Sequence, residues 1–536
     1  MGDQTASKLF VNGRIYQDAV RRVRNLLVVD DCVAAVDVEP SDHMDAEVID
    51  LDGNAIYPGF CDSHVHLVES ALMFSGADLR GDNDAESIVQ AVKTAISEHP
   101  EEDPFFGGGF SLDDYDSWSL KDLAALDAVT GDRIVLLGDD LGHNLIVNSA
   151  AMKKADLYKH LDDVPSGGKV VVQDGKPTGM LREEAMTLAG NQLLHLFKDK
   201  TIRPGTQKFM NLWAQMGYTG IVDLMGAPIG RILHAKMCRK LEHKGLLPLR
   251  VNYNYTFFGL DDLEGGLEEM GKDTDLVRFI GNKLFVDGAY AGGEAWTTWE
   301  NKQGNHGLHT VTAGDSMGKN QNIYRIVSRL EEVGLNCHYH IQGDEALNVT
   351  LDALEAAAAK KGGLSCLHTL IHLAFPRPDQ LQRINKLNNK VVSTVQPGFW
   401  KAEAGLDRYY GKANDASYPI KELMEAGVST GISTDFGVSP LDLSAPTKIM
   451  SISMLDGGSA RTPLTMQDVI RGLTQGSAAT TGHNDVGALY PGMKADMVRF
   501  ERDLYDVKPE SLATDPPKVL ETWLSGKKVI IPDSPK

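Results

Sequence analysis

The chain has few cysteines and no regular spacing between them. Only five of its 536 residues are cysteine, an odd number, and they are scattered along the sequence (Cys32, Cys61, Cys238, Cys337 and Cys366). This pattern argues against a disulfide framework and against the paired spacing of a zinc finger. We therefore expect a reducing compartment, of which the cytoplasm is the simplest.

Long apolar runs and an excess of positive charge are also absent. No apolar stretch approaches the ~20 residues of a membrane helix, and the N-terminus lacks the segments of a signal peptide. The formal net charge of −21 is spread along the chain, which makes nucleic acid a poor partner. We therefore expect a globular protein that acts on a small molecule, with no membrane or nucleic-acid partner.

Short strand patterns at both ends flank a long central region of alternating strand and helix patterns. We expect residues 1–55 and 485–536 to build one composite β-sandwich domain. Residues 56–484 contain eight strand patterns that alternate with helices, which is typical of a parallel (β/α)8 TIM barrel of the α/β class. Residues 70–200 interrupt this alternation after the first barrel strand. They are expected to form an insertion that contributes to the substrate pocket.

The first barrel strand ends in the stretch Asp62-Ser63-His64-Val65-His66. Alternate residues of a strand point to the same side, so His64 and His66 present two imidazoles to one place. Neutral imidazole is the commonest protein ligand for zinc and related ions. A lone His-x-His pair is equally compatible with no function, so the remaining strand ends decide its meaning.

The other predicted strands also end in polar residues that can bind a metal. In a parallel barrel the active site lies at the carboxyl ends of the strands, where residues distant in sequence converge. The residues at those ends are Lys283, His338, His340, His372 and Asp435. Each histidine alone is more often structural, but their shared position predicts one metal centre.

Four motifs along the chain resemble those of the amidohydrolase superfamily. They are Pro-Gly-Phe-Cys-Asp-Ser-His-Val-His at 58–66, Lys-Leu-Phe-Val-Asp-Gly at 283–288, His-Ile-Gln-Gly-Asp at 340–344 and Ser-Thr-Asp at 433–435. The second and third point to the YtcJ-like branch of metal-dependent hydrolases, amidohydrolase family 3, which is N-substituted formamide deformylase-like. The resemblance runs almost from end to end of the chain.

The resemblance implies a cofactor, one or two Zn²⁺ ions per chain, and a role for each matching residue. His64 and His66 would hold the more buried ion, and His340 and His372 the more exposed one. Lys283 would be carboxylated and bridge two ions, because a carbamate is anionic whereas an ammonium would repel them. Asp435 would bind metal and act as the general base.

The activity implied is hydrolysis of a C–N bond in an N-acyl, N-formyl or cyclic amide by a metal-activated water. A deaminase, or an esterase or lactonase, would need the same water. A non-catalytic scaffold that keeps the barrel is a further alternative, although it predicts missing ligands. Two details depart from the family pattern: Ile371 replaces a Glu before His372, and Phe436-Gly437-Val438 follows Asp435. We expect His338 to support the ligands rather than to bind metal.

Substrate recognition depends on the predicted insertion and loops. His143 matches a family position near the substrate and is a candidate for polarising a carbonyl, with an ordinary packing role as the alternative. Aromatic residues in these segments favour a substrate with an aromatic or bulky apolar group, although packing between loops explains any one of them equally well. They are Phe74, Trp118, Trp296, Trp299, Phe399 and Trp400. Family members are often homodimers.

Overall fold

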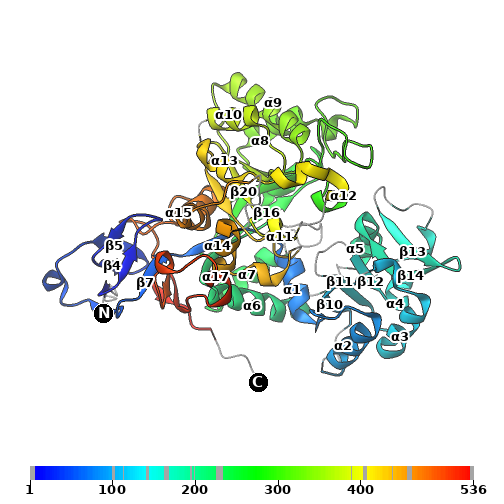
Figure 1. The fold of residues 1–536 in the computed structure, drawn as a ribbon, viewed down its shortest axis with the longest axis horizontal. Helices are drawn as coiled ribbons and strands as arrows, with labels where there is room; N and C mark the ends of the chain where they lie inside the picture. Colours follow the sequence, from blue (N-terminus) through cyan, green and yellow to red (C-terminus); the bar gives the residue numbers. More distant parts are fainter. Residues whose placement is uncertain are drawn as a thin grey trace.

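The computed structural model of the chain has three parts (Figure 1). A strand-rich part built near both termini lies at one side, a barrel with its helices lies in the middle, and a separate α/β part lies at the other side. The structure describes residues 7–98, 103–112, 114–139, 144–161, 164, 168–193, 196–197, 199–224, 233–387, 389–402, 407–437, 439–455 and 461–531.

Eight strands form one parallel sheet that curves into a barrel. In their order in the sheet they are β21 (Thr430–Ile432), β20 (Val391–Val395), β19 (His368–His372), β18 (Cys337–Ile341), β17 (Val277–Phe285), β16 (Arg250–Thr256), β15 (Tyr218–Asp223) and β8 (Phe60–Val65). The first and last strands meet just beyond β21, where Val65 and Phe436 form a parallel bridge. The predicted eight-stranded barrel is therefore confirmed.

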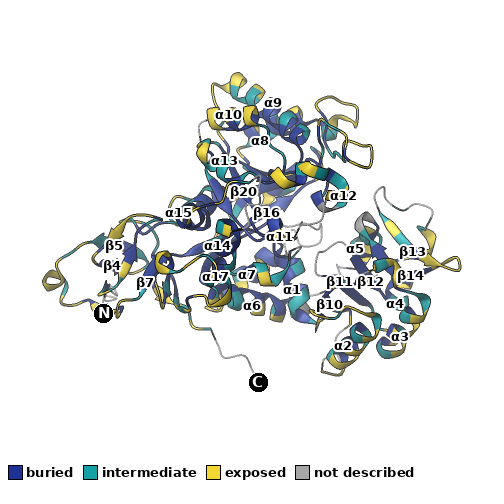
Figure 2. Ribbon diagram, viewed as in Figure 1, coloured by how far each residue is buried: buried dark blue, intermediate teal, exposed yellow. Residues whose placement is uncertain are grey.

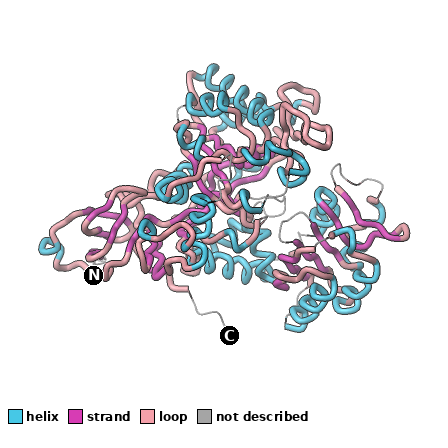
Figure 3. The backbone as a smooth tube through the Cα atoms, viewed as in Figure 1, coloured by secondary structure: helices cyan, strands magenta, loops and turns pink. Residues whose placement is uncertain are grey.

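Helices follow most barrel strands and cover the outside of the barrel (Figure 3). They include α1 (Leu67–Ser75), α6 (Asp199–Gln215), α7 (Leu233–His243), α8 (Ile323–Val333), α9 (Asp344–Lys361), α10 (Pro378–Lys386), α13 (Ile420–Glu425), α14 (Pro446–Leu455), α15 (Met466–Arg471) and α16 (Ser477–Thr481). Helix α8 illustrates how the local sequence sets the start, the buried face and the end of a helix. The Asn322 side chain caps its first turn, a buried stripe from Ile323 to Leu330 faces inward, and Gly334 ends it at φ 76°.

The insertion between β8 and β15 has its own six-stranded mixed sheet. Its strands are β9 (Ala77–Asp78), β10 (Phe105–Phe110), β11 (Val135–Asp139), β12 (Asn144–Val147), β13 (Lys169–Gln173) and β14 (Lys176–Arg182), and its helices are α2 (Ala85–Glu98), α3 (Leu120–Thr130) and α4 (Ser149–Lys154). A separate apolar core joins the sheet to α2. The glycine run at 106–110 lies in β10. A Cβ on Gly108 would come 2.9 Å from the Met73 side chain of α1, so glycine allows this close approach.

Two further sheets lie near the termini, one built from the N-terminal residues alone and one from both ends of the chain. One contains β5 (Cys32–Val36), β4 (Leu26–Val29), β1 (Ser7–Val11) and β6 (Glu47–Asp50). The other contains β24 (Lys527–Lys528), β23 (Val519–Leu524), β22 (Met497–Phe500), β7 (Ala55–Pro58), β2 (Arg14–Tyr16) and β3 (Arg22–Val23). Buried residues from both sheets share one apolar cluster, which contains Phe10 and Trp523. The β-sandwich assignment and its limits stay predictions.

Burial follows this architecture (Figure 2). The barrel strands are almost entirely buried, whereas the outer faces of the helices are exposed. A buried ion pair links the barrel to the terminal sheets, because Arg250 of β16 binds both carboxylate oxygens of Asp496, at 2.5 and 3.1 Å. Among the described residues, every helix is too short or too polar to cross a lipid bilayer.

Candidate metal centre

The predicted metal ligands lie at the carboxyl ends of five barrel strands. The group is His64 and His66 at the end of β8, Lys283 on β17, His340 on β18, His372 on β19 and Asp435 after β21. Ligand atoms of His64, His372 and Asp435 all lie within 4.8 Å of one another. Segments far apart in the sequence therefore meet at one edge of the barrel, as the fold predicts.

Asp435 holds the two histidines of the first strand. Its Oδ1 lies 3.2 Å from Nε2 of His64 and 3.1 Å from Nε2 of His66. The backbone brings these groups together where the barrel closes. The Asp435 amide donates to the His64 carbonyl at 2.9 Å, and the His66 amide donates to the Phe436 carbonyl at 2.7 Å.

His340 and His372 form the second half of the cluster. Nδ1 of His340 lies 3.0 Å from Nε2 of His372, and Nδ1 of His372 lies 3.8 Å from Oδ2 of Asp435. His372 and Asp435 both have left-handed backbone conformations, with φ values of 71° and 59°. Such conformations cost non-glycine residues about 1–3 kcal/mol each and concentrate at functional sites. Here they occur at two predicted ligands, each just past or at the end of its strand.

The electrostatics of the cluster keep most of its imidazoles neutral. Burial, followed by the charge of Lys283, lowers the pKa of His64 well below its usual value and lowers that of His340 to about 3. Burial and the neighbouring His340 lower the pKa of His372 in the same way. His66 differs, because its contact with Asp435 outweighs burial and raises its pKa. Neutral imidazoles have the lone pair that a metal ion requires.

The donor set fits a divalent metal ion. Nε2 of His64 and Oδ1 of Asp435 are buried and have no hydrogen bond. A buried polar atom without a partner is costly unless something else satisfies it. Two donors bound to one ion at ~2.1 Å stand about 3.0–3.4 Å apart. The contacts of Asp435 with His64 and His66, at 3.1–3.2 Å, and of His340 with His372, at 3.0 Å, match this spacing.

Lys283 lies beside the same cluster and is only 1% exposed. Burial lowers its pKa to about 7, against the attraction of Asp435. Its charge in turn lowers the pKa of His64, His340 and His372. An amine that loses its proton near neutrality is nucleophilic enough to react with carbon dioxide.

Two buried aspartates hold the strand ends around the cluster. Asp62 accepts hydrogen bonds from the amide of Thr434 at 2.9 Å, from its hydroxyl at 2.7 Å and from the Trp213 indole at 3.0 Å. Asp287 accepts from the amides of Gln342 and Gly343, at 2.9 and 2.7 Å. Burial raises the pKa of Asp62 to about 6 and that of Asp287 to about 8. The motifs contain both residues, but sequence analysis assigned them no role.

Gln396 is a buried neighbour of the cluster that the sequence analysis missed. It directly follows β20, and its Oε1 lies 2.8 Å from Nδ1 of His372. Its Nε2 lies 2.9 Å from Oγ of Ser433 and 3.5 Å from Nδ1 of His64. The same search for polar residues at strand ends would have found it, had amides been included with histidine, lysine and aspartate.

Two other histidines considered in the sequence analysis have different outcomes. His338 is buried below the cluster, with Nδ1 2.9 Å from the Asn254 amide nitrogen and Nε2 3.1 Å from the Thr480 carbonyl. Both ring nitrogens therefore have protein partners. His143 lies outside the described residues, so its role in polarising a carbonyl stays a prediction.

One predicted substrate-binding aromatic residue contacts the cluster, and a second lies on a loop bound to Asp287. The ring of Phe399 in α11 (Phe399–Ala402) stacks on His372, with centroids 5.9 Å apart and an interplanar angle of 19°. Trp296 is half-buried and stacks on His309 at 4.6 Å. Its backbone amide donates to Asp287 at 3.1 Å, which holds the loop after β17 against the site.

The other four predicted aromatic residues pack between elements of the protein. Trp299 contacts Phe375 edge-on, and the Trp400 indole donates to the Tyr418 carbonyl at 3.3 Å. Phe74 packs against Phe209 and Phe436, and Trp118 is buried in the insertion, where its indole donates to Thr178. These contacts follow the packing alternative that the sequence analysis left open.

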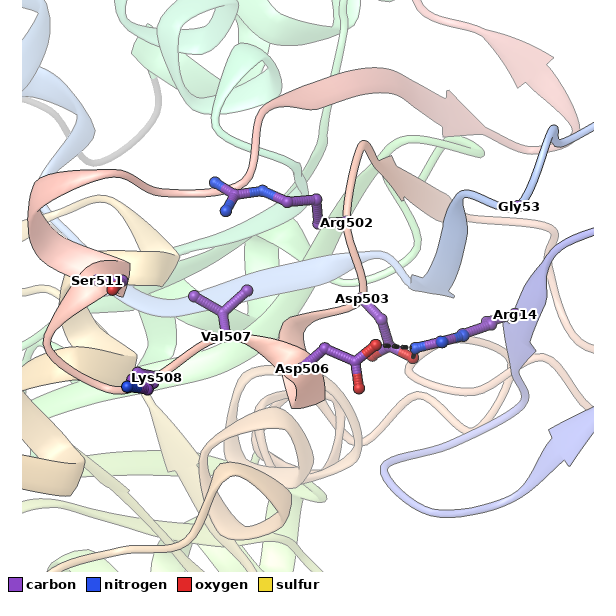
Figure 4. Close-up of a pocket in the computed structure, with 8 residues that line it drawn as sticks. All are labelled: Arg14, Gly53, Arg502, Asp503, Asp506, Val507, Lys508 and Ser511. Atoms are coloured by element: carbon purple, nitrogen blue, oxygen red, sulfur yellow. Dashed lines mark hydrogen bonds and ion pairs between the residues drawn. The ribbon is translucent and has the colours of Figure 1, made fainter.

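A hollow of about 430 Å³ is lined by residues from both ends of the chain (Figure 4). Its lining includes Arg14, Arg502, Asp503 and Asp506. Arg14 pairs with both aspartates, and Arg502 pairs with Asp515 at 3.2 Å. The charges around this hollow are therefore largely matched, and none of its lining residues belongs to the predicted metal ligands.

An eight-stranded parallel barrel with histidines, an aspartate and a buried lysine at its carboxyl edge defines the class of metal-dependent barrel hydrolases. Comparison with known sequences identifies the family within that class. The sequence profile of the amidohydrolase family matches residues 47–530, which is nearly the whole chain. The chain belongs to the amidohydrolase family, and the resemblance noted from its motifs is confirmed.

Individual relatives cover most of the chain at low identity. An N-substituted formamide deformylase from Arthrobacter pascens is 25% identical over 505 residues, covering 90% of this chain and 89% of its own. The Bacillus subtilis protein YtcJ is 26% identical over 480 residues, covering 87% and 88%. The crystal structure of an uncharacterized metal-dependent hydrolase from Pyrococcus horikoshii matches with a TM-score of 0.76 and 21% identity, over 94% of this chain and 99% of that one. This structural likeness establishes the shared fold.

Proposed function

We propose that this protein is a zinc-dependent hydrolase that cleaves a C–N bond of an amide. The observation that carries the proposal is the set of buried donors at one strand edge, in which His64 Nε2 and Asp435 Oδ1 have no hydrogen bond. His64, His66 and Asp435 would hold one ion, and His340 and His372 would hold a second or complete the first. A bound zinc ion polarises the carbonyl and lowers the pKa of its water toward ~7.

Asp435 is the proposed general base. Its carboxylate is buried at the centre of the cluster, between the histidines of β8 and His372. It would take a proton from the attacking water and deliver that proton to the leaving nitrogen, so that the amine leaves neutral. The closed backbone around Asp435 limits its movement during both transfers.

Lys283 is proposed to carry a carboxyl group and to bridge two ions. Its neutral amine would attack carbon dioxide, forming an N–C bond and releasing a proton, which leaves a carbamate with two oxygen donors. Burial favours the neutral amine that this step requires, because it lowers the pKa of Lys283 to about 7. Intact-mass measurement under carbon dioxide tests the step, and Lys283→Met is the control.

The proposed substrate is an amide with an aromatic or bulky apolar group. Phe399 and Trp296 support this choice, because Phe399 stacks on the proposed ligand His372 and Trp296 is a half-buried indole on a loop that binds Asp287. The relative named as an N-substituted formamide deformylase makes N-formyl amides the first compounds to assay. The experiment is a panel of amides, esters, lactones and amino-heterocycles on the zinc-loaded protein, with Asp435→Asn as the matched inactive control.

The panel also separates the alternatives. Deamination of an amino-heterocycle, or cleavage of esters and lactones alone, would replace the amide assignment while keeping the metal-activated water. A protein that binds less than one zinc ion per chain when made with ample zinc and bicarbonate would support a non-catalytic scaffold. The complete set of donors at the cluster argues against that scaffold.

A further inference from the structure

We propose that Gln396 is a positioning residue that fixes which ring nitrogen of His372 is free to bind metal. Gln396 directly follows β20, between the strands that carry His372 and Asp435, and its side chain is completely buried. The inference rests on the proposed metal centre but concerns metal binding alone, whatever bond the enzyme cleaves.

The surroundings of Gln396 set the direction of its amide group. The hydroxyl of Ser433 donates to the Val395 carbonyl at 3.2 Å, so its oxygen is available as an acceptor. Nε2 of Gln396 donates to that oxygen at 2.9 Å, whereas its distance to Nδ1 of His64 is longer, at 3.5 Å. This leaves Oε1 of Gln396 pointing at Nδ1 of His372, at 2.8 Å. Since an amide oxygen only accepts, Nδ1 of His372 carries the proton.

The direction of the amide therefore determines the tautomer of His372. With its proton on Nδ1, the ring has its lone pair on Nε2, which lies 3.0 Å from Nδ1 of His340. The tautomer of His340 is complementary. Its Nε2 faces the Gly288 carbonyl at 3.4 Å, and because that oxygen also only accepts, Nε2 of His340 carries the proton and Nδ1 the lone pair. The lone pairs of both rings then point at each other. Such a pair is repulsive on its own and favourable with a cation bound by both nitrogens.

A reversed amide would have the opposite effect. Nε2 of Gln396 would donate to Nδ1 of His372, which would move the ring proton to Nε2 and direct it at His340. The two rings would then bind each other and offer no lone pair to a metal ion. In that state the Ser433 hydroxyl would have to turn to donate to the Gln396 oxygen, and it would lose its hydrogen bond to the Val395 carbonyl at 3.2 Å. Gln396 thus selects the metal-binding form of the His340–His372 pair.

The experiment compares two substitutions of Gln396 in the full-length protein. In Gln396→Met the new side chain is similar in size to glutamine but lacks the oxygen acceptor. In Gln396→Glu a carboxylate oxygen can still accept from His372. The dissociation constant for zinc is measured by competition with a chromophoric chelator. We expect Gln396→Met to weaken zinc binding 10–100-fold, the range found for partners of metal-bound histidines, and Gln396→Glu to stay within a few-fold of the wild type.

Two results would overturn the inference: zinc binding as tight in Gln396→Met as in the wild type, or equal losses in both variants. Ser433→Ala is a second test, should Gln396→Met not fold, because it removes the group that directs the amide. We expect a several-fold loss of zinc affinity, and unchanged affinity would contradict the orientation argument. A wild-type protein that binds zinc but hydrolyses nothing would refute the proposed function and leave this inference intact.

Discussion

Replacing Lys283 with methionine should make the metal-free protein more stable at neutral and acidic pH, although it removes a proposed ligand. Lys283 is 1% exposed, and burial lowers the pKa of its amine from 10.5 to about 7. The unfolded chain therefore holds this proton more tightly than the folded protein does. Methionine has a similar length and no charge, so it removes the cost of burying the amine while filling the same space.

The size of the effect follows from the two pKa values. At about 1.4 kcal/mol per pH unit, the lowered pKa costs the folded protein about 5 kcal/mol at pH 6. The cost falls to about 2 kcal/mol at pH 9, because above pH 7 the folded protein has already lost this proton, and removing the proton from an amine with the unfolded pKa costs about 1.4 kcal/mol less with each pH unit. It disappears above pH 10.5, where neither state is charged. Lys283→Met should therefore raise the free energy of unfolding of the metal-free protein, by an amount that is largest below pH 7 and shrinks as the pH rises.

The assay is urea unfolding of metal-free protein in buffers depleted of carbon dioxide, at pH 6, 7.5 and 9, for the wild type and the variant. Lys360→Met is the matched control, since Lys360 is an exposed residue of α9 and its replacement should change stability by less than about 0.5 kcal/mol. A stability difference that does not vary with pH, or a less stable Lys283→Met protein at pH 6, would refute the argument. Either result would mean that the lysine has a compensating partner or access to water.

Three further predictions address the site and the domains around it. Asp435→Asn should lower kcat about 10²–10⁴-fold with an unchanged circular dichroism spectrum, and normal turnover would eliminate Asp435 as the base. Trp296→Ala should raise KM for aromatic amides about tenfold and leave small amides unaffected in the same assay, whereas equal changes would indicate a structural role. Asp496→Asn should destabilise the protein by about 3–5 kcal/mol in urea, because it removes the buried carboxylate that binds Arg250; a loss below about 1 kcal/mol would contradict this.

The barrel and its ligands could be predicted because their signals are periodic and local. Each strand appears as a short apolar run, and each ligand stands at or just after the end of such a run, as His64 and Asp435 do. A parallel barrel then brings all eight ends to one edge, so position in the chain is enough to place the ligands together. The insertion was predicted as a segment, but its separate six-stranded sheet was not.

The contacts between side chains could not be predicted in the same way. Trp118 and Trp400 are aromatic residues of predicted loops, as Phe399 is, yet their indoles donate to backbone carbonyls, of Thr178 in the insertion and of Tyr418 just before α13. Whether an aromatic ring faces a cavity or a neighbouring loop depends on the path of both loops, which no periodicity encodes. Gln396 shows the same limit, because its contacts with Ser433 and His372 join residues of different strands that no periodicity places together.

The proposed metal centre also gathers several locally unfavourable features of this fold. Lys283 is a buried amine, His372 and Asp435 have left-handed backbones, and with the proposed tautomers His340 and His372 have opposed lone pairs. Under the proposal each cost would fall when a cation binds: a carbamate on Lys283 would gain a partner, the strained residues would gain bonds, and the opposed lone pairs would become ligands. Stability and metal affinity are therefore coupled at these residues. A substitution that relieves one of these costs should stabilise the metal-free protein while weakening metal binding, which is the relation that Lys283→Met tests directly.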